Sequence, residues 1–209
     1  MNHSGSSPAE QLAFLRSLAV AGQEAPLTAG PYLVAGGAWF GLASLVHWAV
    51  SIDLLGLAPA AYGIIWIAAA VGFGINLFLL VRRDSGQPES GSNRALNAVW
   101  TAIGYSMFVA WFSLWLASSR TADYTLMNAM PLYILAVYGA AWSVAGMLTG
   151  QRWIRATAIG AFASAILVGL MIDSPHLMLA YAAALFACAL VPGLVMMRRA
   201  AAPVPAAAG

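Results

Sequence analysis

Charged residues are scarce in this chain of 209 residues, and lysine is missing altogether. Only 8% of the residues are charged, the nine basic residues are all arginine, and the formal net charge is +2. A chain with so little positive charge lacks the basic surface that nucleic-acid binding requires. We interpret the missing lysine, which accompanies abundant alanine, as a consequence of genomic base composition, and it indicates no partner.

Cysteine is nearly absent as well, since Cys188 is the only one. A single cysteine excludes an intramolecular disulfide and leaves no cysteine pair for a zinc or iron–sulfur site. Cys188 lies in the middle of an apolar stretch, so we expect it to be a small packing residue.

The motifs of familiar enzymes are missing too. The sequence contains no glycine-rich phosphate loop, no HExxH pair and no GxSxG elbow. Its long apolar stretches contain no aspartate or glutamate, whereas proton-coupled transporters usually carry a buried acidic residue in a span. These absences predict a protein that is not an enzyme, and they argue against ion-coupled transport.

Apolar residues are what the chain has in abundance. They make up 62% of the sequence and give a mean hydropathy of +0.81, more than a soluble domain needs. About 20 apolar residues in a helix cross the ~30 Å of a bilayer's hydrocarbon, and continuous stretches of this kind occur six times. They run from Tyr32 to Ile52, Ala60 to Val81, Ala95 to Ala117, Pro131 to Thr149, Trp153 to Ile172 and Leu177 to Met197. The sequence therefore predicts an all-α membrane protein with six transmembrane helices.

The arginines predict the orientation of these helices. If the spans alternate in direction as three hairpins, Arg120 lies on one face of the membrane and the other eight arginines lie on the opposite face. Membrane insertion keeps basic residues of short loops in the cytoplasm, so we expect both termini on the cytoplasmic side. The eight are Arg16, Arg82, Arg83, Arg94, Arg152, Arg155, Arg198 and Arg199.

A short amphipathic helix is predicted before the first span. Ser7-Pro8-Ala9-Glu10 combines an N-cap serine, a proline at the first helical position and a capping-box glutamate. Leucines and an alanine then recur at helical spacing until Gly22 and Pro26 end the pattern. We interpret this helix as lying on the inner membrane surface and orienting the first span, and the alternative is that it docks a cytoplasmic partner.

The predicted domains follow from these segments. Residues 1–30 form a cytoplasmic leader, residues 31–198 form the transmembrane domain, and residues 199–209 form a disordered cytoplasmic tail rich in alanine and proline. The connection from Asp84 to Arg94 is rich in glycine, serine and proline, and we expect it to be flexible.

The stretch from Phe14 to Val50 contains an Ala25-Pro26-Leu27 break, a Gly30-Pro31-Tyr32 entry and His47 near the end of the first span. In these features it resembles the opening of a group of uncharacterised bacterial six-helix integral membrane proteins. The resemblance implies a multi-pass protein of the bacterial inner membrane. It implies no catalytic or binding residues, because no activity is known for that group.

Small residues at helical spacing indicate which faces pack together. Lipid tails compete with leucine for apolar contact, so close backbone approach must hold the helices together. Asn76 adds an amide that can form a hydrogen bond across an interface, and an aromatic ridge in the third span either fills grooves between helices or faces lipid. The predicted packing residues are Gly37, Gly41, Gly72, Asn76, Gly139, Ser143 and Gly146, and the ridge is Tyr105, Phe108, Phe112 and Trp115.

One candidate ligand set lies at the predicted outer face. His47 is one turn before the end of the first span, His176 begins the last span, and Asp53 and Asp173 lie on the same face. If the first and last spans are neighbours, these residues could bind a metal ion or ligate a haem. The alternative is that each histidine is satisfied structurally, and on that alternative we expect no cofactor.

Function is predicted mainly from what is missing. We expect a regulatory or accessory protein that works by association with another protein, in addition to contact with the lipid bilayer and self-association. One alternative is a facilitative carrier or channel for a small neutral solute, and another is a metal- or haem-binding membrane protein. A short repeat favours the carrier, because Thr101–Gly104 recurs as Thr157–Gly160 and duplicated hairpins frame the sites of many transporters.

Overall fold

The computed structural model describes residues 9, 11–13, 27–85 and 90–201, and this part of the chain is helical without strands. The prediction of an all-α protein is confirmed. The helices are α2 (Gly30–Ser51), α3 (Ala61–Asp84), α4 (Gly91–Thr121), η1 (Tyr124–Asn128), α5 (Ala129–Thr149), α6 (Arg152–Gly169), α7 (Leu177–Leu185), η2 (Phe186–Leu190) and α8 (Val191–Ala200).

Several of these helices are long and apolar enough to cross a membrane. They are Gly30–Ser51, Ala61–Asp84, Gly91–Thr121, Tyr124–Thr149 and Leu177–Ala200. These five candidate spans within the described residues indicate a multi-pass membrane protein. α6, the counterpart of the fifth predicted span, is not among them, because its 18 residues begin with Arg152 and include Arg155 one turn later.

Some boundaries differ from the predicted ones. α4 begins at Gly91, inside the connection predicted to be flexible, because Ser90 Oγ accepts a hydrogen bond from the amide of Asn93 (3.2 Å) and caps the helix. α8 continues to Ala200, so it enters the predicted tail. Residues 9 and 11–13 are helical, and the remainder of the predicted leader helix and of the tail lies outside the described residues.

The last span changes helix type in its middle. Pro192 has no amide hydrogen, and in a regular α-helix that amide would bond to the carbonyl of Cys188, four residues earlier. The chain forms the π-helical turn η2, which ends two residues before this proline, and the indole nitrogen of Trp142 in α5 donates to the Cys188 carbonyl (2.9 Å). Because Pro192 cannot donate to it, the Cys188 carbonyl accepts a hydrogen bond from another helix.

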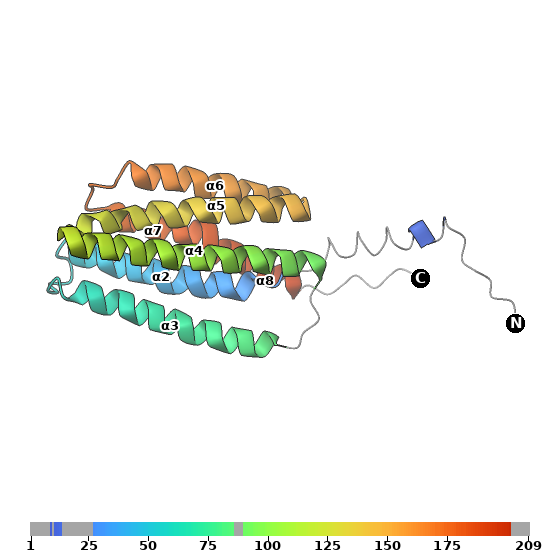
Figure 1. The fold of residues 1–209 in the computed structure, drawn as a ribbon, viewed down its shortest axis with the longest axis horizontal. Helices are drawn as coiled ribbons and strands as arrows, with labels where there is room; N and C mark the ends of the chain where they lie inside the picture. The colour runs from blue at the N-terminus through green and yellow to red at the C-terminus, as the bar shows by residue number, and fades with distance from the viewer. Residues whose placement is uncertain (1–8, 10, 14–26, 86–89, 202–209) are drawn as a thin grey trace, which may run out of the picture.

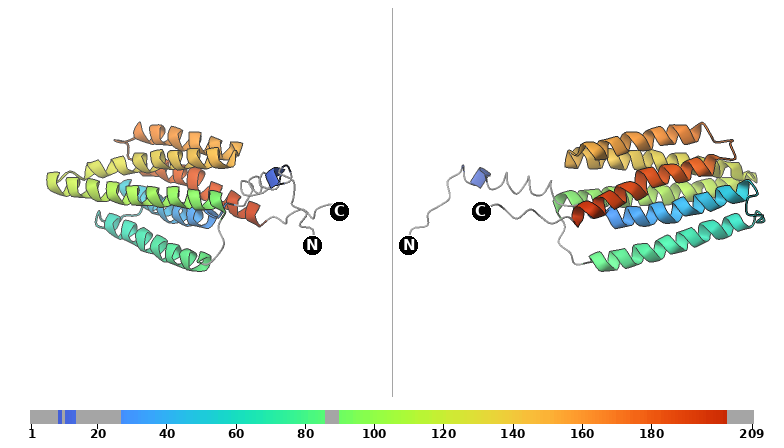
Figure 2. Two further views of the ribbon diagram at one scale, coloured as in Figure 1. Left: turned by 45° about the vertical axis from the view of Figure 1, so that its right-hand side comes forward. Right: turned by 180° about the vertical axis from the view of Figure 1, so that it is seen from behind.

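The helices lie side by side around α2 and α5 (Figure 1). α2 contacts α3 and also α7, η2 and α8, so the first and last predicted spans are neighbours. α5 packs most extensively against α6 and also contacts α4. Figure 2 shows from behind that α2 runs between α3 and the α7–α8 span.

Two apolar clusters form the interior. One surrounds Trp142 and includes Leu33, Leu96 and Ile154, and the rings of Trp100 and Trp153 pack against it. The other lies nearer the start of α7 and includes Leu135, Val168, Tyr181 and Leu185. Cys188 is buried in the first cluster, where the sequence predicted a packing residue.

α3 and α4 turn most of their surface outward. In their most apolar windows 11% and 0% of the residues are buried, against 50% for α2 and for the α7–α8 span. The aromatic ridge of α4 is exposed, with Tyr105 at 71% and Phe108 at 63%. The rings of Phe108, Phe112 and Trp115 stack along the outside of the helix, so the ridge does not fill an internal groove.

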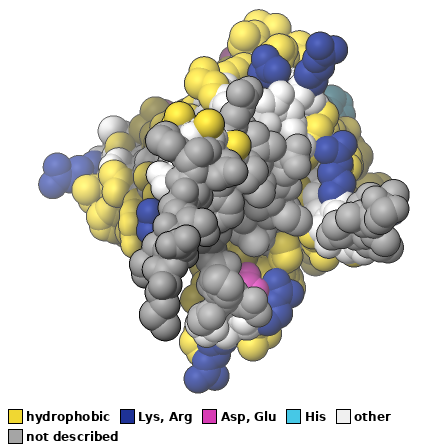
Figure 3. Space-filling model, turned by 90° about the vertical axis from the view of Figure 1, so that its right-hand side faces the viewer, with side chains coloured by type: hydrophobic (Ala, Val, Ile, Leu, Met, Phe, Trp, Pro, Cys, Tyr) yellow, Lys and Arg dark blue, Asp and Glu magenta, His cyan; other side chains and the backbone are white. Residues whose placement is uncertain are grey.

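The two ends of the bundle differ in charge. Figure 3 looks onto the end where α2 begins and α3 ends, and arginine side chains are spread around its rim. Among the described residues this end carries Arg82, Arg83, Arg94, Arg152, Arg155, Arg198 and Arg199, and Arg120 lies at the opposite end with the end of α4.

Candidate functional site

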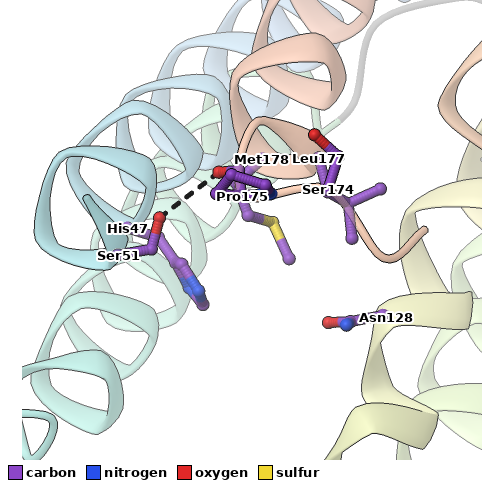
Figure 4. Close-up of a pocket in the computed structure, with 7 residues that line it drawn as sticks. All are labelled: His47, Ser51, Asn128, Ser174, Pro175, Leu177 and Met178. Atoms are coloured by element: carbon purple, nitrogen blue, oxygen red, sulfur yellow. Dashed lines mark hydrogen bonds between the residues drawn. The ribbon is translucent and has the colours of Figure 1, made fainter. Parts of the chain in front are cut away.

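A pocket of about 140 Å³ opens at the end of the bundle opposite the arginine-rich rim (Figure 4). α2 contributes two residues from its last turns, η1 contributes one, and the α6–α7 connection and the start of α7 contribute the others. The lining residues are His47, Ser51, Asn128, Ser174, Pro175, Leu177 and Met178.

His47 is held at the pocket by two aromatic residues of α3. The indole nitrogen of Trp66 donates to Nδ1 of His47 (3.0 Å), and the Tyr62 ring stacks on the imidazole with 4.2 Å between ring centroids. Trp66 and Tyr62 are four residues apart and therefore lie on one face of α3. The contact ties the end of α2 to the start of α3.

His176 is held in a similar way from α2. The indole nitrogen of Trp48 donates to Nδ1 of His176 (3.0 Å). Ser51 Oγ donates to the Trp48 carbonyl (2.7 Å) and also lies 3.4 Å from the Pro175 carbonyl, as Figure 4 shows. The neighbouring residues His47 and Trp48 of α2 thus connect this helix to α3 and to the residue that precedes α7.

These bonds fix the chemistry of both imidazoles. An indole nitrogen can only donate, so each Nδ1 accepts and each neutral ring carries its proton on Nε2. A metal ion binds an unprotonated ring nitrogen. In each histidine that nitrogen is Nδ1, which is occupied by the tryptophan N–H, so metal binding would require each ring to release its tryptophan partner.

The aspartates predicted to assist the histidines do not complete a metal site. Asp53 and Asp173 are exposed, and no three His, Cys, Asp or Glu residues of the described chain lie together as a candidate metal site. Among the described residues, His47, His176, Asp53 and Asp173 therefore do not form a three-ligand metal site. The structural alternative accounts for both histidines, with tryptophan N–H groups as their partners.

The pocket instead combines neutral polar groups with apolar walls. Asn128 lies across the pocket from His47 (Figure 4), and among the described residues its amide has no hydrogen-bond partner. The Nε2–H of His47 is a donor, and the amide of Asn128 both donates and accepts. Such an arrangement suits a small uncharged polar molecule rather than an ion.

The glycines predicted to pack lie at close contacts between helices. A Cβ atom at Gly37 would come within 2.7 Å of the Leu190 backbone nitrogen, and one at Gly41 would overlap the Phe186 ring. Both contacts join α2 to η2. Corresponding approaches join Gly72 to Trp39, Gly139 to Phe162 and Gly146 to Arg155.

The predicted polar packing residues bond within their own helices. Asn76 Nδ2 donates to the Gly72 carbonyl (3.0 Å), and Ser143 Oγ donates to the Gly139 carbonyl (2.8 Å). Each reaches back one turn to a glycine of the packing stripe. The bond that was predicted to cross an interface at Asn76 is thus an intrahelical one.

Sequence reasoning missed two close contacts of the last span. Gly193 approaches Gly30 so closely that a Cβ atom at Gly193 would lie 2.8 Å from the Gly30 carbonyl oxygen. Trp142 bonds to the Cys188 carbonyl, as described above. The spacing of four residues between Cys188 and Pro192 was the available signal for the second contact, because it marks the carbonyl that loses its donor.

No protein-family model, curated protein or solved structure matches this chain. The resemblance seen in Phe14–Val50 therefore stays a prediction.

Proposed function

We propose that this chain is a bacterial inner-membrane protein with six spans and both termini in the cytoplasm, with α6 as the additional span. α6 packs extensively against α5 and lies alongside it (Figure 1), so a bilayer that surrounds α5 also surrounds α6. Arg152 and Arg155 lie near its start, where their side chains reach the headgroup region. The arginine-rich rim supports a cytoplasmic location for that end.

Reporter fusions test this topology. A periplasm-dependent reporter fused after Ala58, Ala122 or Ser174 is expected to be active, and fusions after Gly86 or at the C-terminus are expected to be inactive. Activity after Gly86 would reverse the orientation. If the C-terminal fusion and the fusion after Ala58 are both active, the number of spans is odd, and the proposal of six spans is wrong.

The protein acts, on this proposal, as an accessory partner of another membrane protein, which α4 binds. The observation that carries the proposal is a mismatch between apolarity and burial. α4 has the lowest mean hydropathy of the five candidate spans, 1.4, yet none of its most apolar window is buried. α3 is nearly as exposed, but its mean hydropathy is 2.4. A helix that faces only lipid is expected to be strongly apolar, which fits α3 and not α4.

The exposed face of α4 also has the residues of a protein interface. Aromatic side chains are enriched where proteins associate, and here they form an exposed ridge of Tyr105, Phe108, Phe112 and Trp115, the last three of them stacked. Gly104 beside this ridge has open space around it, so a partner helix can approach the backbone closely.

Site-specific photocrosslinking in native membranes tests the partner. A photoreactive phenylalanine analogue at Phe112 is expected to give a protein adduct of one defined mass, and the same analogue at Phe78 on the outer face of α3 is expected to give lipid adducts. The adduct at Phe112 should disappear when Phe108 and Trp115 are replaced by leucine. Lipid adducts alone at both positions overturn the proposal, and an adduct with a second copy assigns α4 to self-association.

The pocket favours one alternative function, a facilitative carrier or channel for a small neutral solute. Its hydrogen-bonding groups are uncharged and belong to His47, Ser51, Asn128 and Ser174. Proteoliposomes provide the test with urea and glycerol as probes. Permeability above that of empty liposomes, lost in Asn128→Leu, supports the carrier, and permeability equal to that of empty liposomes rejects it for these solutes.

A further inference from the structure

One corner of the arginine-rich end is built from the start of α6 and the end of α8. The guanidinium of Arg199 donates from Nη1 to Gln151 Oε1 (3.0 Å) and lies 4.9 Å from the centroid of the Trp153 ring. The indole nitrogen of Trp153 donates to the same Gln151 oxygen. These contacts hold the last turn of α8 against the first turn of α6.

This corner concentrates positive charge. Arg152 and Arg155 are three residues apart in α6 and lie on one face of that helix, while Arg198 and Arg199 end α8. All four side chains are exposed. Arg155 donates from Nη2 to the Gly150 carbonyl (3.0 Å), which keeps its guanidinium near the start of α6.

No described carboxylate balances that charge. Within the described ranges the ion pair is Arg83–Asp84 at the end of α3 (2.9 Å), and the carboxylate there also accepts a bond from Tyr32. The other described aspartates, Asp53, Asp123 and Asp173, lie in the connections at the opposite end of the bundle. The α3 corner therefore carries its own counter-charge, and the α6–α8 corner leaves room for an external anion.

We propose that the α6–α8 corner binds the phosphate group of an anionic phospholipid. Guanidinium groups bind phosphate oxygens through paired hydrogen bonds, and clusters of arginine beside a membrane helix attract anionic lipid headgroups. Trp153 lies at the same level, where tryptophan favours the boundary between hydrocarbon and headgroups. The site requires only that the bundle crosses a bilayer, so it is independent of the partner proposed for α4.

Native mass spectrometry and thermal unfolding of the full-length protein test the site, with phosphatidylglycerol as the probe. The protein is expected to retain phosphatidylglycerol in preference to phosphatidylcholine and to unfold at a higher temperature in nanodiscs that contain it. The double variant Arg152→Gln/Arg198→Gln removes two guanidiniums that have no structural bond to another described residue. It is expected to bind the lipid about tenfold more weakly, since charge-assisted bonds to phosphate are lost.

Control variants separate this corner from a general effect of charge. Arg94→Gln and Arg82→Gln remove charge from the same end of the bundle and are expected to leave lipid retention unchanged. Equal loss of lipid in these variants reduces the site to nonspecific attraction and overturns the proposal, as does full retention by the double variant. Inorganic phosphate in phosphatidylcholine nanodiscs is expected to give no stabilisation, and stabilisation equal to that by the lipid would assign the corner to free phosphate.

Discussion

The α7–α8 span and α4 differ in how closely they pack against the other helices of the bundle. The α7–α8 span lies against α2 over most of its length and also contacts α5 and α6, whereas α4 contacts α5 and η1. Glycines lie at the contacts of the first, with Gly193 against Gly30 and Leu190 against Gly37. In α4, Gly104 meets open space. Both are long and apolar enough to cross a membrane, and close backbone approach is what distinguishes the inner helix from the outer one.

The largest expected effect tests this distinction directly. Gly37→Leu places a side chain against the backbone of Leu190, which cannot move aside without separating α2 from the last span. We expect a loss of unfolding free energy of about 3 kcal/mol or more, at the upper end of overpacking effects. The midpoint of thermal unfolding in detergent is the measurement.

Gly74→Leu and Gly104→Leu are the matched controls on the outer helices. Neither position has an atom of another helix within 4 Å of an added Cβ, so both variants are expected to unfold near the temperature of the unaltered protein. If Gly74→Leu is as damaging as Gly37→Leu, the division into inner and outer helices is wrong.

The second expected effect concerns the bond that crosses the interior. Trp142→Phe keeps an aromatic ring but removes the donor to the Cys188 carbonyl, which Pro192 cannot replace. A buried acceptor left without a donor costs about 1–3 kcal/mol. Trp115→Phe on the exposed ridge of α4 is the control and is expected to change stability little, and an equal loss in both variants would show that ring size matters rather than the bond.

The helical fold was predictable from sequence because its signal is length and apolarity, which each span carries by itself. The packing glycines were also predictable, since Gly37 and Gly41 recur at helical spacing in one span and Gly139 and Gly146 do so in another. The sequence did not indicate which helix each glycine meets, because that depends on the order of helices around the bundle. The start of α4 was placed too late, because the Ser90 cap was taken as part of a flexible connection.

The candidate site was predictable only in part. His47 and His176 were correctly placed at one end of the bundle, and α2 and α7 are neighbours as the hypothesis required. Their partners Trp66 and Trp48 were not predicted, because tryptophan near the end of a span is also typical of the membrane interface. An indole nitrogen is a donor that can be aimed inward as well as toward the headgroups, and periodicity does not distinguish these directions.

A smaller effect is expected where an outer helix is fastened to an inner one. The bond from Trp66 to His47 joins α3 to α2 at a half-buried position, where water or headgroups can replace it. Hydrogen bonds between membrane helices contribute on average about 0.6 kcal/mol. The double-mutant cycle of Trp66→Phe and His47→Phe is expected to return a coupling of about that size. A coupling of zero would mean that stacking by Tyr62, and not this bond, holds the start of α3.

The smallest effect is expected at the end of α4 opposite the arginine-rich rim, where exposed hydrogen bonds help to hold the connection to α5. Asp123 Oδ1 accepts hydrogen bonds from the hydroxyl and the amide of Thr125, which lower the pKa of the Asp123 carboxyl below its ordinary value of 3.8. Since the folded pKa lies below the unfolded one, this contribution to stability is present above the unfolded pKa and is lost as the pH falls through the folded pKa. The charge is fully exposed, so solvent screening keeps the contribution small.

Carboxyl NMR titration of aspartate-labelled protein measures this effect without relying on stability. Thr125→Val removes the hydroxyl donor, which is the largest cause of the shift, and keeps the amide donor. The pKa of Asp123 is therefore expected to rise toward 3.8 without reaching it. Thr149→Val, at the other end of the bundle, is expected to leave the titration unchanged. An unaltered Asp123 pKa in Thr125→Val would show that the amide alone holds the carboxylate, and that the C-terminal end of α4 is secured by the backbone of η1.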